Sequence, residues 1–480
     1  MKLNFSKYAG LALLGVMAGS ANGQTQKMPN VVLILADDMG YGDLNCYGAT
    51  RYTTPNLDKL AAGGIRFTNF YVSQAVCSAS RAALLTGCYS NRVGIAGALN
   101  PGSLVGLNSQ EETIAEVLKK RGYKSAIFGK WHLGFQPQFL PLQQGFDEYF
   151  GLPYSNDMWG YNINGEHKNP NYRPLKLIDG NKEVKEITSM DDQAQLTTIY
   201  TEHAVSFIDR HKKEPFFLYM PYAMPHVPIA ASNKFKGKSE QGVYGDVLME
   251  IDWSVGQIME TLTKNGLTEN TLVIFTSDNG PWLNFGNHAG SAGGLREGKG
   301  TSWEGGQRVP CIMKWPGHIP EGLVCNKIAS TIDVLPTLAH ITQSPLPAHK
   351  IDGVNILPLM TGDQNANPRE VFLYYYNANC LEAVQKNQWK LVFPHPSRTY
   401  EGFAPGKDGV GGKTASVQVG SALYDLRRDP GERYDVKEYN PEVVAELSKI
   451  ADEARLDLGD GIMNIKGANV REPGRVEEPK

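Results

Sequence analysis

A cysteine and an arginine four residues apart are the first candidates for a reactive site in this sequence. Cys77 and Arg81 lie in the segment Val-Cys-Ser-Ala-Ser-Arg. If a helix begins near Cys77, both side chains project from the same helix face. The first turn of a helix carries unpaired N–H groups and the positive end of the dipole, so the segment predicts a site for a tetrahedral anion. For this pattern alone, a small buried cysteine with a surface arginine is the simpler interpretation.

Oxygen-bearing side chains follow two apolar runs elsewhere in the chain. Asp37 and Asp38 come after Val-Val-Leu-Ile-Leu-Ala, and Asp278 and Asn279 come shortly after Leu-Val-Ile-Phe. Ligands of open α/β sheets gather at the carboxyl ends of strands, and oxygen donors suit Ca²⁺ or Mg²⁺. Neighbouring strand residues point to opposite faces, so the chain must leave the sheet at the Asp-Asp pair, and the glycines that follow permit that turn. A solvated turn or a helix cap explains either pair taken alone.

Two lysines and two histidines complete the set of candidate catalytic residues. Lys130 and His132 are two apart, so they share a face if the chain stays extended. His226 lies between prolines that stiffen its loop, and Lys299 lies in the glycine-rich residues 293–306. A lysine supplies fixed positive charge, and a histidine exchanges protons near neutral pH. An exposed lysine or a packed histidine is the alternative at each position.

The elements that must position these residues alternate between apolar strands and amphipathic helices. The continuous aliphatic runs favour a large, mostly parallel sheet flanked by helices, that is, an α/β fold. The predicted strands are residues 30–36, 67–72, 123–128, 215–220, 272–275 and 309–315, and the predicted helices are residues 54–63, 111–121, 197–210, 242–265 and 330–338.

Residues 151–183 are rich in Asn, Tyr, Gly and Pro, and we expect a long irregular insertion near the site. Such segments often bind substrate. The candidate substrate-binding residues are Tyr154, Asn156, Asp157, Asn284 and His288. His167 and the aromatic residues Trp159, Tyr161 and Trp282 are further candidates for sugar contacts.

The pattern of predicted secondary structure changes after about residue 365. Residues 372–376, 383–385, 389–393 and 423–426 are predicted antiparallel strands, and residues 441–457 are a predicted amphipathic helix. We therefore expect a catalytic domain over residues 28–364 and a smaller α+β domain over residues 365–480, with the last ten or so residues disordered.

The N-terminus has the pattern of a cleaved secretory signal covering residues 1–23. A positively charged start precedes the apolar residues 8–18, and Ala-Asn-Gly follows at the place of a signal peptidase site. The apolar stretch is too short to span a membrane, and no cysteine for lipid attachment stands at the cut. We expect export, most simply to the periplasm, with an uncleaved anchor as the alternative.

Charge and cysteine usage narrow the function classes. The net charge of -3 gives no basic footprint for nucleic acid, and no later segment is predicted to enter a membrane. The six cysteines are scattered without zinc-type spacing. An exported chain could form disulfides, but the spacing names no pairs.

In chain order these motifs resemble the type I sulfatases, which belong to the alkaline-phosphatase-like superfamily, and among them the bacterial carbohydrate sulfatases. The Cys-x-Ala-x-Arg signature is the specific part, and the match covers nearly the whole chain after the signal. The segments that carry it are Leu-Ala-Asp-Asp (35–38), Cys-Ser-Ala-Ser-Arg (77–81), Gly-Lys-Trp-His-Leu-Gly (129–134), Pro-His (225–226), Ser-Asp-Asn-Gly (277–280), Gly-Lys-Gly (298–300) and Leu-Tyr-Asp-Leu (423–426).

The resemblance implies that a maturation enzyme oxidises Cys77 to formylglycine, an aldehyde that works as its hydrate. One hydroxyl of the hydrate attacks sulfur, and collapse of the hydrate to the aldehyde then expels sulfate. A simple serine would be left as a stable sulfate ester. The resemblance also implies one Ca²⁺ ion, bound by Asp37, Asp38, Asp278, Asn279 and the modified Cys77.

The same resemblance assigns a role to each candidate catalytic residue. Arg81 would fix the hydrate, and Lys130 and Lys299 would neutralise sulfate oxygens. His132 would be the base for hydrate collapse, and His226 would donate a proton to the leaving oxygen.

The implied function is that of an exported sulfatase acting on a sulfated sugar of a host or dietary glycan, with galactose or N-acetylgalactosamine sulfate preferred. The nearest alternative is a phosphomonoesterase or phosphonate hydrolase of the same fold, which would use Ser or Thr and two Zn²⁺ ions. A non-catalytic glycan-binding relative is the alternative from another class.

Overall fold

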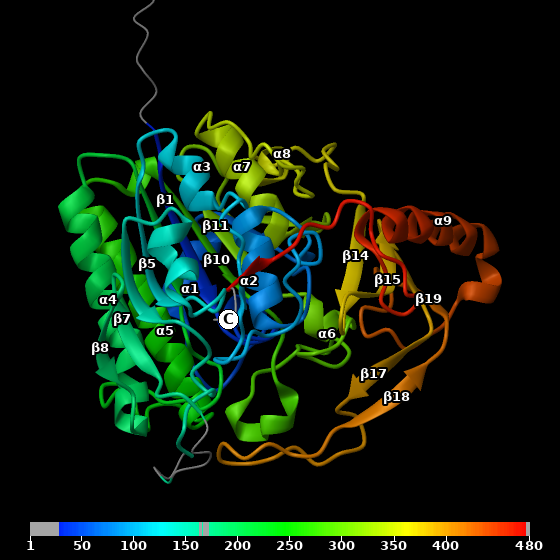
Figure 1. Cartoon of the computed structure of the whole chain (residues 1–480), viewed down its shortest axis with the longest axis horizontal. Coiled ribbons are helices and arrows are strands. Elements are labelled where there is room, and N and C mark those ends of the chain that lie inside the picture. The colour runs from blue at the N-terminus through cyan, green and yellow to red at the C-terminus, as the bar shows by residue number, and fades with distance from the viewer. Residues whose placement is uncertain (1–27, 163–165, 167–171, 477–480) are drawn as a thin grey trace, which may run out of the picture.

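A ten-stranded mixed sheet forms the centre of the molecule (Figure 1). The computed structural model describes residues 28–162, 166 and 172–476, so the predicted signal and His167 lie outside the described residues. The sheet order is β12-β2-β11-β10-β1-β9-β5-β6-β7-β8, and the neighbours from β10 to β6 are all parallel. The strands are β1 (Asn30–Ala36), β2 (Ile65–Phe67), β5 (Lys124–Lys130), β6 (Glu148–Leu152), β7 (Lys176–Asp179), β8 (Lys182–Glu186), β9 (Phe216–Pro221), β10 (Thr271–Ser277), β11 (Cys311–Lys314) and β12 (Leu323–Cys325).

Strand β1 lies between β9 and β10, and both of its faces are buried. Its alternate residues feed two separate cores: Val31, Leu33 and Leu35 enter one, and Val32 and Ile34 enter the other. This is the arrangement that a continuous aliphatic run predicts for an inner parallel strand. The end of β1 is therefore held rigidly beside the end of β10, where Ala36 is opposite Ser277.

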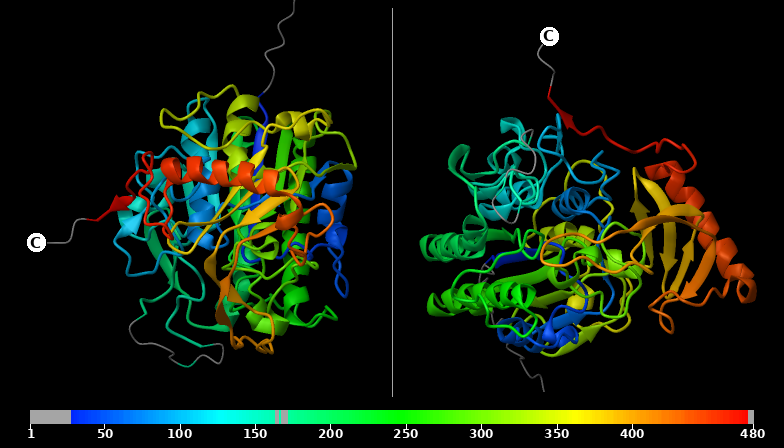
Figure 2. Two further views of the ribbon diagram at one scale, coloured as in Figure 1. Left: turned by 90° about the vertical axis from the view of Figure 1, so that its right-hand side faces the viewer. Right: turned by 90° about the horizontal axis from the view of Figure 1, so that it is seen from below.

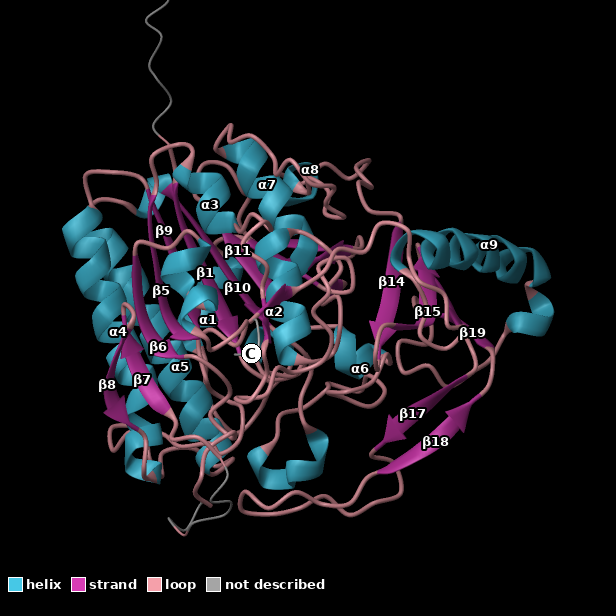
Figure 3. Cartoon of the chain, in the orientation of Figure 1, coloured by secondary structure: helices cyan, strands magenta, loops and turns pink. Residues whose placement is uncertain are grey.

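Helices cover both faces of this sheet (Figure 3). Side chains of α2, α3, α7 and α8 belong to one core, and those of α1, α4 and α5 belong to the other. The helices are α1 (Pro55–Ala62), α2 (Cys77–Thr86), α3 (Ile114–Lys119), α4 (Met190–His211), α5 (Val243–Lys264), α6 (Glu304–Gln307), α7 (Val334–Ile341), α8 (Leu357–Met360) and α9 (Pro441–Leu458). Short 3-10 turns are η1 (Asn45–Tyr47), η2 (Pro137–Phe139), η3 (Pro141–Gln144), η4 (Thr268–Asn270), η5 (Leu283–His288), η6 (Thr331–Asp333) and η7 (Lys437–Tyr439).

A four-stranded antiparallel sheet, in the order β14-β15-β16-β19, lies beside the large sheet and carries α9 on its outer face (Figure 2). These strands and the helix share a third core. The strands are β14 (Val371–Tyr376), β15 (Cys380–Lys386), β16 (Trp389–Val392) and β19 (Ala422–Asp425). The hairpin of β17 (His395–Thr399) and β18 (Ala415–Val419) extends from this region, and its connection runs below the large sheet toward η5 (Figure 1).

Two expectations about strands need correction, and a third concerns the C-terminal residues. The predicted strand at residues 67–72 is interrupted: β2 ends at Phe67, and β3 (Phe70–Tyr71) pairs instead with β13 (Ala329–Ser330). The irregular segment 151–183 contains β7, which pairs with β6 and so belongs to the large sheet. On its other side β7 pairs with β8, the polar edge strand of the sheet.

The last residues that the structure describes are ordered rather than disordered. Strand β20 (Gly474–Arg475) pairs with β4 (Val105–Gly106), and the Arg471 guanidinium binds the Glu111 carboxylate at 2.6 Å. These partners are more than 300 residues away in the chain, so local sequence gave no sign of them. The six cysteines are all free thiols, and no helix within the described ranges combines the length and apolarity that a bilayer crossing requires.

Candidate active site

The two oxygen-bearing pairs predicted from the sequence meet because β1 and β10 are parallel neighbours. The backbone N–H of Asp38 donates to Asp278 Oδ1 at 3.1 Å, and Asn279 Nδ2 donates to Asp38 Oδ1 at 2.7 Å. All of these side chains are buried. The carboxyl ends of the two strands therefore form one compact cluster of carboxylate and amide oxygens.

The chain leaves the sheet at Asp38 itself, not at the glycines that follow. Asp38 has φ 64°, a left-handed conformation that only a few non-glycine residues adopt. This turn lets Asp37 and Asp38 serve the same cluster. Gly40 has a different role, because a Cβ there would lie 2.2 Å from the carbonyl oxygen of Ser291.

Helix α2 begins at Cys77, as the sequence predicted, and ends at Gly87 in a left-handed C-cap. Arg81, one turn along, is fully buried and reaches back to the oxygen cluster. Its Nε donates to Asp278 Oδ2 at 3.0 Å, and its Nη2 lies 3.3 Å from Asp37 Oδ2. The arginine is thus a buried link between the helix that carries Cys77 and the strands that carry the carboxylates, and not a surface residue.

Both lysines point into the same cluster. Lys130 Nζ lies 2.6 Å from Asp37 Oδ2 and 3.1 Å from Ser155 Oγ. Lys299 Nζ lies 2.7 Å from Asp38 Oδ1. Three cations, counting Arg81, therefore face the three carboxylates of this buried site.

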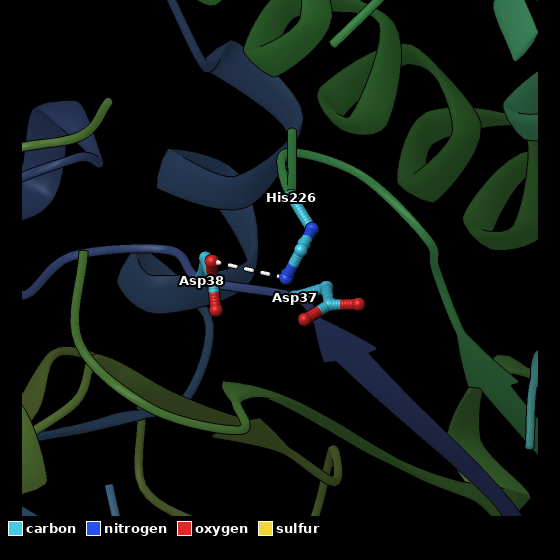
Figure 4. Close-up of side chains that lie close together, drawn as sticks. All are labelled: Asp37, Asp38 and His226. Atoms are coloured by element: carbon cyan, nitrogen blue, oxygen red, sulfur yellow. Dashed lines mark ion pairs between the residues drawn. The ribbon is translucent and has the colours of Figure 1, made fainter. Parts of the chain in front are cut away.

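The two histidines make different contacts at the site, and each has one ring nitrogen that no hydrogen bond from the described residues uses. His226 Nδ1 contacts the Val227 carbonyl oxygen at 2.6 Å, which leaves Nε2 facing Asp38 Oδ2 at 3.6 Å (Figure 4). His132 Nε2 contacts the Leu99 carbonyl oxygen at 2.9 Å, and its buried Nδ1 has no hydrogen-bond partner among the described residues. His132 has φ 62°, so the chain does not stay extended through this residue, and the condition for Lys130 and His132 to share a face is not met.

The pKa values reflect burial and the crowding of charges. Burial raises the pKa of Asp37, but the positive charges of Lys130 and Arg81 oppose this effect, and the net shift is downward. Burial and then the Asp37 carboxylate raise the pKa of Asp278. Burial followed by Lys130 and Arg81 holds the pKa of His132 well below its usual value, so this imidazole is neutral at neutral pH. Burial also raises the pKa of the Cys77 thiol.

The cluster suits a hard divalent cation. Asp37 Oδ1 and Asn279 Oδ1 are buried and accept no hydrogen bond from any described residue. Asp37, Asp38 and His226 each offer a ligand atom within 4.8 Å of the others. Carboxylate and amide oxygens are the ligands that Ca²⁺ and Mg²⁺ prefer, so the donor set fits the ion that the resemblance implies.

The structure divides the candidate substrate-binding residues into two groups. Asp157 lies near His226, Lys299 and Lys130, and its Oδ1 is buried without a partner among the described residues. Asn156 Nδ2 donates to the carbonyl oxygens of His226 and Pro228, so it braces the histidine loop.

Trp282 also lies at the site. Its ring packs 5.5 Å from that of His226, and Lys299 Nζ lies 4.4 Å from its centroid. Tyr154 and Trp159 are core residues instead, with 5% and 2% of their surface exposed. Asn284 and His288 lie on η5, and Asn284 Nδ2 donates to the Gly412 carbonyl oxygen. Burial lowers the pKa of His288, and the Asp408 carboxylate opposes this effect. Neither Asn284 nor His288 makes a hydrogen bond or ion pair with the Asp37 cluster within the described residues.

Sequence reasoning missed the residues that the C-terminal region brings to this site. Tyr400 Oη donates to the Lys299 carbonyl oxygen, and Thr399 and Tyr400 both bond to the Glu297 carboxylate. Burial raises the pKa of Tyr376, and the charges of Arg398, Glu382 and Lys299 also act on it. These residues lie about 100 positions after Lys299 and carry no motif, so only the fold reveals them.

Comparison with known proteins gives matches along most of the chain. A family model described as sulfatase matches residues 29–344, and one for the C-terminal region of aryl-sulfatase matches residues 367–473. Arylsulfatase A of Homo sapiens is 39% identical, covering 91% of this chain and 89% of the relative. N-acetylgalactosamine-6-O-sulfatase of Bacteroides thetaiotaomicron is 34% identical, covering 90% and 94%. The crystal structure of PsFucS1 sulfatase from Pseudoalteromonas sp. superposes with a TM-score of 0.79 at 29% identity, covering 90% and 91%.

Proposed function

The chain belongs to the sulfatase family, and from this premise we propose that it removes sulfate from O-sulfated sugars with a formylglycine derived from Cys77. Membership of the family makes it a sulfuric ester hydrolase. The single observation that supports the proposed chemistry is one buried site in which Arg81, one turn after Cys77 on α2, bonds to the Asp37–Asp38–Asp278–Asn279 cluster. Lys130, Lys299, Asp37 and Asp278 also act electrostatically on the Cys77 thiol. A monoanionic sulfate ester matches a site with a divalent cation, two lysines and an arginine.

The proposed cofactors supply the attacking group and a fixed positive charge. A formylglycine hydrate at residue 77 would provide a hydroxyl nucleophile, and Ca²⁺ on Asp37, Asp38, Asp278 and Asn279 would polarise a sulfate oxygen. Arg81 remains charged, since Asp278 and Asp37 raise its pKa against the effect of burial, and it orients the group at residue 77. Lys130 and Lys299 can each shift from a carboxylate to a sulfate oxygen without leaving the cluster.

The histidines are placed for the two proton transfers. His132 Nε2 carries its proton toward the Leu99 carbonyl, so the unpartnered Nδ1 is the acceptor for the proton that the hydrate must lose. His226 presents Nε2 toward Asp38, and it would protonate the leaving sugar oxygen. Neutral His132 would thus be the base for hydrate collapse, and the half-buried ring of Trp282 would be a platform for the sugar.

A sugar substrate is supported by two independent observations. Trp282 lies between Lys299 and His226, where an aromatic ring would pack against the apolar face of a pyranose. Asp157 has a buried oxygen that could accept a hydrogen bond from a sugar hydroxyl. The name of the Bacteroides relative favours 6-sulfated N-acetylgalactosamine as the first compound to test, and sulfated galactose is the second that the resemblance suggested.

Export is part of the proposal and depends on the sequence alone. The charged start, short apolar stretch and small residues before Gln24 support a cleaved signal, which would place the enzyme in the periplasm. A formylglycine-generating enzyme is then a required partner, because the unmodified thiol is not the nucleophile in this mechanism.

The experiment is a sulfate-release assay on protein that is coexpressed with a maturation enzyme. The panel contains sulfated galactose and N-acetylgalactosamine, glycosaminoglycan oligosaccharides, a steroid sulfate and a phosphomonoester. We expect release from sulfated sugars, and a loss of about a thousandfold or more for Cys77→Ala, since removing a nucleophile removes the covalent route. Cys380→Ala, which removes a thiol outside the site, is the matched control. Turnover by Cys77→Ala, or activity only on the phosphomonoester or the steroid, would disprove the proposal.

A further inference from the structure

Strand β17 carries an arginine to the wall of the candidate active site. Arg398 lies against Gly300: a Cβ built on that glycine would be 2.6 Å from Arg398 Nη1 and 3.0 Å from Tyr376 Oη. Gly300 follows Lys299 directly, and its N–H donates to the carbonyl oxygen of Ala75, two residues before Cys77. The guanidinium therefore packs on the backbone of Gly300. This glycine is next to Lys299 in the chain and is hydrogen-bonded to the segment that precedes Cys77.

Arg398 differs from the other cations of the site because no carboxylate neutralises it. Arg81, Lys130 and Lys299 each lie within 3.5 Å of an aspartate oxygen. Arg398 makes no ion pair with a carboxylate in the described ranges, and it is only partly buried. Burial lowers its pKa, whereas the phenol of Tyr400, to which its side chain is hydrogen-bonded, and that of Tyr376 raise it, and the net direction is upward. A positive charge without a carboxylate partner thus lies beside Gly300, next to Lys299.

The chain that follows Arg398 is held at two places. The next two residues of the chain, Thr399 and Tyr400, bond to the Glu297 carboxylate, and Tyr400 also bonds to the Lys299 carbonyl. Further along, the backbone N–H groups of Gly406 and Gly412 donate to the Asn284 carbonyl at 2.8 and 2.7 Å, so the connection between β17 and β18 is tied to η5 (Figure 1). A guanidinium that is held in place in this way loses little conformational entropy when it binds a partner.

The chemistry of the partner follows from the chemistry of the group. A guanidinium presents a planar fork of N–H donors that matches the two oxygens of a carboxylate or a sulfate. The sulfate that reacts is already provided with Arg81, two lysines and the oxygen cluster, so the free guanidinium lies where a second oxyanion of the same substrate can reach it.

We propose that Arg398 binds a second anionic group of the substrate, and that the enzyme prefers sulfated sugars carrying a further sulfate or a neighbouring uronate over singly charged ones. This inference depends on the proposed function. It adds that the preferred substrate carries a second negatively charged group. Arg398 would be a specificity-determining residue that contacts substrate without taking part in the bond changes.

The test compares kcat/KM for the best monosulfated sugar with that for its disulfated form and for the disaccharide in which a uronic acid is attached. We expect the wild type to prefer at least one doubly charged compound by about tenfold or more, mainly through KM. Arg398→Gln should remove most of this preference, and Arg398→Lys should keep part of it, because lysine retains the charge but not the fork. The compound that loses most identifies the second group as sulfate or carboxylate.

Two controls separate this effect from a general one. Arg427→Gln removes the same charge from an exposed arginine that pairs with Asp425, and it should keep the wild-type preference. Thermal melting shows whether Arg398→Gln and Arg398→Lys remain folded. A wild-type enzyme that cleaves sulfated sugars without preference, or a preference that survives Arg398→Gln, overturns the inference about Arg398 alone. Failure to release sulfate from any sugar overturns the proposed function instead.

Discussion

At the scale of single residues, each lysine of the candidate site binds a carboxylate that the proposed calcium ion would also use. Lys130 binds Asp37, and Lys299 binds Asp38. In the proposed mechanism, an oxyanion beside these carboxylates would lie within reach of both ammonium groups. Its electrostatic stabilisation would be preorganised, because burial of these side chains leaves them few other partners.

A second buried pair, Glu382 and His395, shows how protonation is matched to hydrogen bonding in the C-terminal sheet. Burial raises the pKa of Glu382 to about 8, and burial lowers the pKa of His395. His395 Nδ1 lies 2.6 Å from the Phe393 carbonyl oxygen and so carries its proton, which makes Nε2 an acceptor. Glu382 Oε2 lies 3.3 Å from that Nε2, and a protonated carboxyl is the donor that this geometry requires.

This pair predicts a pH-dependent stability. The pKa of Glu382 is higher in the folded state than its ordinary value of 4.5, so folding is favoured by the bound proton and stability falls as pH rises from about 4.5 to about 8. Glu382→Gln keeps a donor to His395 Nε2 and cannot ionise. We expect its stability relative to the wild type to improve on going from pH 5 to pH 8, by an amount on the order of a few kcal/mol.

The measurement is urea unfolding of both proteins at pH 5, 6, 7 and 8, followed by far-UV circular dichroism. Glu446→Gln, which changes an exposed carboxylate on α9, serves as the control and should show no such trend. A constant difference between Glu382→Gln and the wild type across this pH range would show that Glu382 is ionised in the folded protein.

At the scale of secondary-structure elements, the sequence was sufficient where burial is continuous. Strand β1 has the predicted limits, and the ends of α5 each lie within one residue of the predicted ones. The reason is that the hydrophobic pattern of an inner parallel strand or of a long amphipathic helix continues along its whole length. The adjacency of β1 and β10 then brings the two Asp-containing pairs together. The oxygen cluster and its contact with Arg81 were therefore within reach of sequence reasoning.

Other features depend on contacts that no local pattern contains. The left-handed turns at Asp38 and His132 are imposed by the fold, because neither residue type requires them. Tyr154 and Trp159 look like surface aromatics in a polar segment but pack into the core. Arg398 and Tyr400 reach Lys299 only because the hairpin of β17 and β18 folds back on the large sheet.

At the scale of the whole molecule, a buried ionic network joins the C-terminal sheet to the loop that carries Lys299. Lys390 on β16 lies 3.1 Å from Glu304 Oε1 on α6 and 2.7 Å from Glu432 Oε1, and it donates to the Ser302 carbonyl oxygen at 2.8 Å. All three ionic side chains are buried. Burial raises the pKa of Glu304, but Arg308 and Lys390 lower it to about 2, so its charge depends on these cations. The smaller sheet thus stabilises residues 299–304 of the site.

We expect Lys390→Met to destabilise the protein by about 3–5 kcal/mol, because it leaves two buried carboxyl groups without their shared cation. Sulfate release should fall as well, since the loop that carries Lys299 loses an anchor. Lys386→Met on the adjacent strand removes an exposed lysine and should change neither quantity appreciably. The check is the thermal midpoint together with kcat/KM. Equal midpoints for the two variants would mean that the network does not hold the sheets together.

The central claim is that the nucleophile is an aldehyde hydrate made from the thiol at the start of α2. The most direct measurement is the mass of the peptide containing Cys77, taken from a preparation that is releasing sulfate from a sugar. The account predicts that residue 77 is recovered as formylglycine in proportion to the active fraction. An active preparation in which residue 77 is an unmodified cysteine throughout would contradict it.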